Sequence, residues 1–210
     1  MFRNLTNPDN PLMITMSHVT DCIFLSLFYL LGCFPVVTIG ATSAALYDAV
    51  YRGFRKKDKH SWQRFAASFR RNFKMSFFAL IPYLAVLLGG GYGMIQVWNA
   101  FAVGKISDVL FAGAALLAVM LLGIISVLFP LLSRFETSVG QLLKNTVLLA
   151  LANMPRTLCL GVLNGMSIFL CVRFIVPLFF LPALAAFLSS YLLEPMFAPY
   201  MPKEEETAAE

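Results

Sequence analysis

The chain has 210 residues, of which 59% are hydrophobic and 13% charged, with a net charge of +5 and a mean hydropathy of +0.76. A soluble domain has about 25% charged residues. One bilayer crossing takes about 20 apolar residues, so this length holds five or six spans and excludes a soluble catalytic domain. We therefore expect an all-α polytopic transmembrane domain over residues 1–202 and a disordered charged tail over residues 203–210.

No pattern of reactive side chains predicts a catalytic, cofactor or metal site. His18 and His60 have no second histidine or thiol at ligand spacing, and the four cysteines lie in apolar runs without C-x-x-C spacing. The motifs G-x-S-x-G and H-E-x-x-H are absent from the sequence. The turn-rich residues 7–11 follow one basic residue, Arg3, so we expect the first apolar run to be a retained span rather than a cleaved signal.

Five apolar runs match the thickness of a bilayer. They predict spans at residues 12–34, 76–98, 109–132, 157–172 and 178–193. Residues 133–153 carry Arg134, Glu136 and Lys144 and precede Pro155. They are predicted to form a cytoplasmic interfacial segment.

The region between the first two spans predicts two further helices. Residues 35–51 are short for a span and include the polar residues Thr38 and Asp48, which favours a re-entrant or interfacial helix packed against the bundle, with a sixth span as the alternative. Residues 60–74 place aromatic side chains at helical spacing with basic ones largely off that stripe, which predicts a helix in the headgroup layer. Its membrane-surface residues are Trp62, Phe65, Phe69, Arg70, Arg71 and Phe73.

Charge predicts the orientation in a bacterial cytoplasmic membrane. Residues 52–74 carry nine basic side chains and one acidic side chain, Asp58. The positive-inside rule places this loop in the cytoplasm, so five spans leave the N-terminus outside and the C-terminus inside. The basic excess also predicts contact with anionic lipid headgroups. No feature of the sequence indicates nucleic-acid binding.

Two groups of residues inside the spans have a functional and a structural interpretation. His18 and Asp21 share one helix face, and they form either a proton or cation site or a carboxyl that is hydrogen-bonded within the bundle, for example to Asn164. Gly161 and Gly165 form a G-x-x-x-G pair, and residues 89–93 hold four glycines. Small residues permit close helix packing within the chain, and dimerisation or a hinge is the alternative. Arg173 and Glu194 are placed where they can extend to the interfaces.

The chain resembles the YesL-type family of bacterial integral membrane proteins. The resemblance begins at Phe34-Pro-Val-Val-Thr-Ile-Gly40 and continues at Ala41-Thr-Ser-Ala-Ala-Leu-Tyr47. It includes Trp62-Gln-Arg-Phe65, Leu151-Ala-Asn-Met-Pro-Arg-Thr-Leu158 and Phe187-Leu-Ser-Ser-Tyr-Leu-Leu193. It covers almost the whole chain, and the P-x-x-T-I-G segment with the later N-x-P-R-T-L is its most specific part. In that family the position of Asp21 is more often an uncharged polar residue.

The resemblance implies a role beside carbohydrate transporters, because such proteins are typically encoded next to carbohydrate ABC importers. We therefore expect an accessory or structural subunit without chemistry of its own, in contact with the permease or ATPase subunits. Residues 136–155 have a weak outline of the cytoplasmic helix that permeases present to the ATPase, and a plain interfacial helix is the favoured interpretation. The rival expectation is a small transporter or channel using Thr38, Asp48, His18 and Asp21.

The predicted orientation is testable by cysteine labelling in intact cells. A single cysteine near Lys57 should resist a membrane-impermeant thiol reagent, whereas one near Lys105 should react, because the basic loop is predicted to be cytoplasmic. Labelling near Lys57 but not near Lys105 would reverse the orientation.

Overall fold

The computed structural model describes the backbone of residues 11–55, 61–135 and 137–200, and the side chains of these ranges from Thr20 onward. Helices make up the described chain, which contains no strand, so the predicted all-α class is confirmed. The longer helices are α1 (Pro11–Cys33), α2 (Ile39–Val50), α3 (Ser61–Ala102), α4 (Asp108–Arg134), α5 (Val139–Ala152), α6 (Met154–Arg173) and α8 (Leu181–Phe197). Short helical turns are η2 (Val36–Thr38), η3 (Tyr51–Arg55), α7 (Ile175–Leu178) and η4 (Ala198–Tyr200).

Several helices are long and apolar enough to cross a bilayer, as expected of a multi-pass membrane protein. Within the described residues these are α3, α4, α6 and α8 with its continuation to Tyr200. The first predicted span corresponds to α1, which has 23 residues. Helix α8 begins three residues later than predicted, because α7 and a turn follow α6.

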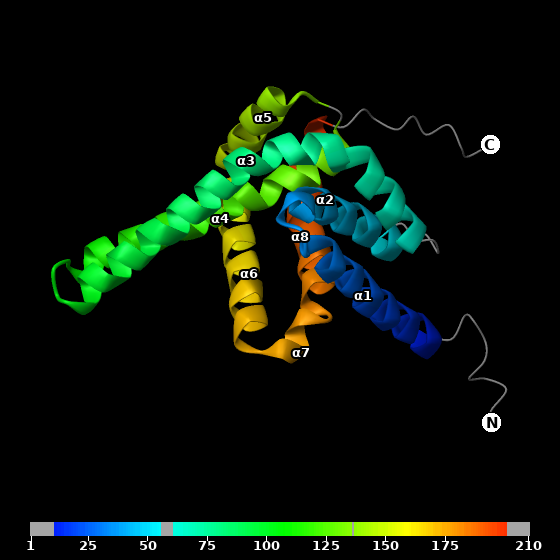
Figure 1. The fold of residues 1–210 in the computed structure, drawn as a ribbon, viewed down its shortest axis with the longest axis horizontal. Helices are drawn as coiled ribbons and strands as arrows, with labels where there is room; N and C mark the ends of the chain where they lie inside the picture. Colours follow the sequence, from blue (N-terminus) through cyan, green and yellow to red (C-terminus); the bar gives the residue numbers. More distant parts are fainter. Residues whose placement is uncertain (1–10, 56–60, 136, 201–210) are drawn as a thin grey trace.

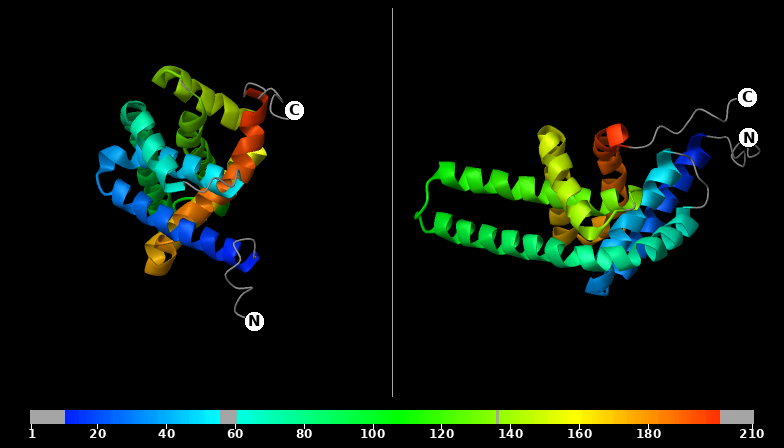
Figure 2. Two further views of the ribbon diagram at one scale, coloured as in Figure 1. Left: turned by 90° about the vertical axis from the view of Figure 1, so that its right-hand side faces the viewer. Right: turned by 90° about the horizontal axis from the view of Figure 1, so that it is seen from above.

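The long helix α3 corrects the predicted boundary near residue 75. The headgroup helix at residues 60–74 and the span at residues 76–98 were expected to be separate, but α3 runs unbroken through both. No glycine or proline stands between residues 61 and 81 to end the helix. Its 42 residues extend about 63 Å at 1.5 Å per residue, about twice the thickness of the hydrocarbon core. The helix is curved in Figure 2.

The first part of α3 buries small polar side chains and exposes aromatic ones. Ser68, Asn72 and Ser76 repeat every four residues and are buried, and the Asn72 amide donates to the Ser68 hydroxyl at 3.2 Å. Trp62 and Phe73, by contrast, are 60% and 41% exposed. Small polar side chains allow close approach between helices within a bilayer. This face of α3 therefore packs inward, and the aromatic face points outward.

Helix α2 lies in the interior of the bundle. Ten of its twelve residues are buried, and it contacts α1, α3, α4 and α8. Twelve residues span only about 18 Å, too short to cross a bilayer. The segment 35–51 is thus a short helix enclosed by the bundle, rather than one with a free polar face.

Helices α3 and α4 pair antiparallel and extend beyond the other helices, as Figures 1 and 2 show. We call residues 88–102 of α3 and 108–117 of α4 the distal arm; no residue in either range is buried. At its tip the rings of Phe101 and Phe111 stack at 4.4 Å, and Trp98 lies 5.8 Å from Phe111. An added Cβ at Gly89, Gly91 or Gly93 would meet no other described helix within 4 Å. The expected packing within the chain therefore does not involve these three glycines.

The crossing of α4 and α6 depends on two other glycines. An added Cβ at Gly161 would lie 2.0 Å from the carbonyl oxygen of Val119, and one at Gly123 would lie 2.1 Å from that of Thr157. Real Cβ atoms do not approach backbone oxygens so closely. Gly165, four residues beyond Gly161, is in ordinary contact with Leu122 at 3.6 Å. Gly161 therefore belongs to the intramolecular packing of the bundle.

Alanine at Gly161 or Gly123 should destabilise the protein strongly. The added methyl group must push two backbones apart, and overpacking costs about 1–3 kcal/mol or more. The measurement is the thermal unfolding midpoint in mild detergent. Gly93→Ala is the matched control, because its Cβ has open space and alanine favours a helix by up to about 1 kcal/mol. Equal midpoints for Gly161→Ala and Gly93→Ala would contradict the close crossing.

Candidate functional site

A largely buried ion pair connects α4 to α8. The Nη2 of Arg134 lies 2.7 Å from Oε1 of Glu194, and the two side chains are 10% and 12% exposed. Arg134 Nε donates to the same oxygen at 3.1 Å, and the Tyr47 hydroxyl on α2 donates to it at 2.8 Å. Burial and the neighbouring carboxylate raise the pKa of Tyr47 above its ordinary value, so it stays protonated and donates. The carboxylate thus joins three helices.

Two arginines stack on the tyrosines around this ion pair. The guanidinium of Arg134 lies 3.6 Å from the ring centre of Tyr51, and that of Arg55 lies 4.7 Å from the ring centre of Tyr191. Arg55 Nη1 also donates to the carbonyl oxygen of Ser190 at 3.2 Å. Cation–π contacts of this kind strengthen when water is excluded. We call Tyr47, Tyr51, Arg55, Arg134, Tyr191 and Glu194 the Arg–Tyr cluster.

Local helix geometry places the cluster on one side of the α2–η3 segment. Tyr47, Tyr51 and Arg55 recur every four residues, so they lie above one another on one helix face. The segment ends in the π-helical turn η3, and Asp48 pairs with Arg52 at 2.8 Å across this junction. In the cluster a carboxylate, two guanidiniums and three phenols are mutually paired. This arrangement fixes the three helices relative to one another.

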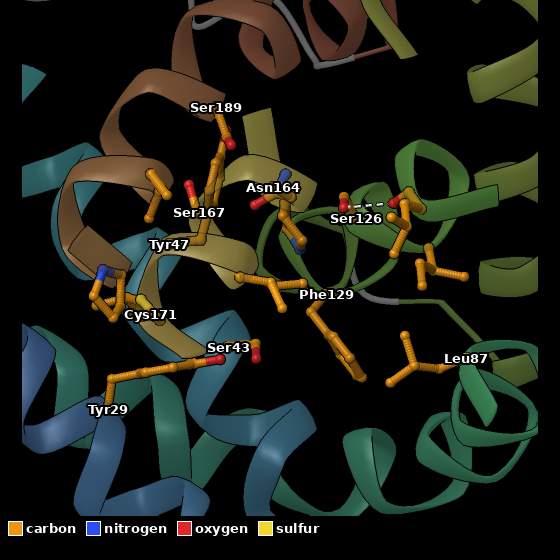
Figure 3. Close-up of a pocket in the computed structure, with 18 of the residues that line it drawn as sticks. Tyr29, Ser43, Tyr47, Leu87, Ser126, Phe129, Asn164, Ser167, Cys171 and Ser189 are labelled. Atoms are coloured by element: carbon orange, nitrogen blue, oxygen red, sulfur yellow. Dashed lines mark hydrogen bonds between the residues drawn. The ribbon is translucent and has the colours of Figure 1, made fainter. Parts of the chain in front are cut away.

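A cavity of about 320 Å³ lies beside the cluster. Figure 3 shows its labelled polar side chains, which come from several helices: Tyr29 from α1, Ser43 and Tyr47 from α2, Ser126 from α4, Asn164, Ser167 and Cys171 from α6, and Ser189 from α8. Leu87 and Phe129 contribute apolar surface. Convergence of a few polar groups in an otherwise apolar cavity is typical of a ligand site.

The polar groups of the cavity are hydrogen-bonded mainly to their own helices. Ser126 donates to the carbonyl oxygen of Leu122 at 2.6 Å, and Ser167 donates to that of Leu163 at 2.7 Å. The Asn164 amide nitrogen donates to the carbonyl oxygen of Leu160 at 3.0 Å. Asn164 was suggested from the sequence as one hydrogen-bond partner for Asp21. In the structure the Asn164 side chain lies in the cavity and is hydrogen-bonded within α6. Among the described residues, no group of three histidine, cysteine or acidic side chains is placed to hold a metal ion.

The Thr-Ile-Gly segment fixes the junction of α1 and α2. The Thr38 hydroxyl donates to the carbonyl oxygens of Gly32 and Pro35, and Thr42 donates to that of Thr38 at 2.7 Å. An added Cβ at Gly40 would lie 2.5 Å from the Phe129 ring. Thr38 therefore satisfies carbonyls at the end of α1, and Gly40 permits the approach of α4.

The polar set expected of a transporter does not converge on the cavity. Thr38 lies at the α1–α2 junction, and Asp48 is 3% exposed and paired with Arg52. Asp21 is partly exposed on α1 and engages in an interaction of its own. The side chain of His18 lies outside the described side chains. None of the three described members lines the cavity.

The residues predicted to lie at the membrane surface divide between exposed positions and positions packed against other helices. Trp62, Phe73 and Arg70 are exposed. Phe65 and Phe69 are partly buried, and the Phe65 ring lies 6.1 Å from that of Phe28 on α1. Arg71 Nη2 donates to the carbonyl oxygen of Ser133 at 3.1 Å, at the C-terminal end of α4. A cation there satisfies a terminal carbonyl and favours the helix dipole.

Sequence reasoning missed the Arg–Tyr cluster. Glu194 was expected at an interface and Arg134 in the interfacial segment 133–153, and no contact between them was predicted. The available signal was the spacing of Tyr47, Tyr51 and Arg55 on a segment too short to span. Their partners Arg134, Tyr191 and Glu194 lie more than 80 positions away along the chain, and local periodicity carries no information about them.

Residues 19–89 match the model of a family described as a protein of unknown function, DUF624. The matched region contains most of α1, all of α2 and the first two thirds of α3, and with them Tyr47, Tyr51 and Arg55. Among the curated proteins and among the solved structures, none matches the chain. The chain is therefore similar to this family over less than half of its length, and the match assigns no activity to it.

Removing one partner of the ion pair should cost more stability than removing both. Arg134→Gln leaves the Glu194 carboxylate largely buried without its counter-ion, which costs about 3–5 kcal/mol for a buried pair. Adding Glu194→Gln should restore part of that loss. A double-mutant cycle on unfolding in detergent measures the coupling.

The control for this cycle is Arg156→Gln, because Arg156 is exposed and its hydrogen bond to Asn153 lies at the surface. That change should have little effect. Additive effects of the Arg134 and Glu194 changes would contradict a coupled pair.

Proposed function

We propose that the protein is an accessory membrane subunit of a carbohydrate ABC importer, with no chemistry of its own. The observation that carries the proposal is the distal arm. The two helices of the arm extend away from the bundle (Figure 1), and their side chains Leu88, Tyr92 and Val109 are 68%, 66% and 81% exposed. A two-helix extension with glycines on an open face offers close backbone approach to a helix of another subunit.

The Arg–Tyr cluster supports the same role. Its charges are engaged with one another, so the cluster acts as a rigid base from which the arm extends. The resemblance to YesL-type proteins, which spans segments both within and beyond the matched residues 19–89, supplies the importer as the partner. We infer that the permease meets the arm within the bilayer, with the basic residues 52–74 facing the cytoplasm.

The test is affinity purification of the tagged protein from its own membrane in mild detergent. An ABC permease should co-purify, and Gly93→Leu should reduce its recovery, because the leucine projects into the open face of the arm. Cys159→Leu is the control, since Cys159 is exposed on α6 and does not belong to the arm. The gel-filtration profiles of both variants should match that of the unmodified protein.

The rival function is an independent transporter, and the uncharged cavity is the observation that favours it. A transporter using Asp21 and His18 would lose activity in the double variant Asp21→Asn with His18→Ala, whereas an accessory subunit would tolerate these changes. Failure to recover a permease, together with sugar or ion flux from the purified protein alone in vesicles, would reverse the ranking.

A further inference from the structure

The cavity beside the Arg–Tyr cluster has an uncharged lining. The described side chains around it are aliphatic, aromatic, hydroxyl, thiol or amide groups, and none of them carries a charge. A buried ion without a counter-charge loses its hydration without compensation. A charged ligand is therefore disfavoured, and a neutral one is not.

Three side chains of the cavity, Ser126, Asn164 and Ser167, offer hydrogen-bond acceptors. The hydroxyl hydrogens of Ser126 and Ser167 are used on the carbonyl oxygens of Leu122 and Leu163, which leaves the lone pairs of the hydroxyl oxygens as acceptors. Asn164 donates through its nitrogen to Leu160, and its amide oxygen adds a further acceptor. These groups complement a ligand that carries hydroxyl groups.

One side of the cavity reaches the apolar surface of α6. Ile168 and Val172 line the cavity and are also 53% and 84% exposed. They lie on a helix long and apolar enough to cross the bilayer. Asn164 is eight residues before Val172, about 12 Å deeper along the helix. The cavity thus opens between exposed apolar side chains of α6. Asn164 lies deeper in the cavity than Val172 does.

These three features define the ligand, and we propose that the cavity binds one neutral hydroxylated lipid of the monoacylglycerol or long-chain alcohol class. The hydroxyl headgroup lies at Ser126, Asn164 and Ser167, and the hydrocarbon chain leaves past Ile168 and Val172. The volume of about 320 Å³ equals about ten water molecules, enough for a headgroup and the first part of one chain. The inference is independent of the partnership with an importer.

The test uses the full-length protein in nanodiscs with a photoactivatable monoacylglycerol that carries a diazirine next to the headgroup. Cross-linked peptides mapped by mass spectrometry should come from α4, α6 and α8, around Ser126, Asn164, Ser167 and Ser189. Unlabelled monoacylglycerol should compete, whereas a fatty acid of the same chain length should compete at least about tenfold less well, a difference of about 1.4 kcal/mol.

Two variants locate the site. Asn164→Leu removes an acceptor and should lower labelling about fivefold, the loss expected for one neutral hydrogen bond. Val172→Trp should obstruct the opening, and because Val172 is mostly exposed the change should leave the fold intact. Phe169→Trp is the matched control, since Phe169 is 63% exposed on the same helix and does not line the cavity.

Labelling spread over the exposed apolar surface, including the distal arm, would overturn the proposal. So would labelling at α6 and α8 that is insensitive to Val172→Trp. Equal competition by the fatty acid would refute the neutral hydroxylated class. Loss of labelling in Val172→Trp but not in Phe169→Trp, together with weak competition by the fatty acid, supports it.

Discussion

The Glu194 carboxylate is the constraint on which the arrangement of the bundle depends. It is nearly buried and accepts hydrogen bonds from Arg134 on α4 and Tyr47 on α2, so a helix shift that left either buried charge without its partner would carry a large penalty. Because α2 is enclosed by α1, α3, α4 and α8, fixing it fixes its neighbours as well. Arg55, Arg134 and Glu194 also come from segments that the charge pattern assigns to one side of the membrane.

The fold class and most spans were predictable, because crossing a bilayer imposes length and hydropathy on each segment separately. The predicted spans at residues 12–34 and 109–132 agree with α1 and α4 within two residues. The continuity of α3 through residue 75 was not predictable in this way. A change from amphipathic to apolar composition at residue 75 indicates a change of surroundings, but the backbone continues as a helix unless a residue interrupts it.

Which face of a helix meets protein was the least predictable feature. In water, burial separates apolar from polar side chains, but in a bilayer both lipid and protein are apolar and the distinguishing property is size. Gly161 and the glycines at 89–93 look alike in sequence. Gly161 nevertheless touches the Val119 backbone, whereas Gly89, Gly91 and Gly93 face open space. Similarly, the inward face of α3 carries Ser68, Asn72 and Ser76. From the sequence, only the aromatic stripe of this helix had been identified.

Tyr47 links the two parts of the candidate site. Its hydroxyl is held by Glu194, and its ring borders the cavity, so one side chain belongs to both the charged cluster and the uncharged chamber. The charge remains outside the cavity because the guanidinium of Arg134 stacks on Tyr51 and pairs with Glu194 instead of reaching the lining. A change at Tyr47 would disturb ion pairing and cavity shape together. The two parts can be separated only at positions that belong to one of them, Arg134 for the cluster and Asn164 or Val172 for the cavity.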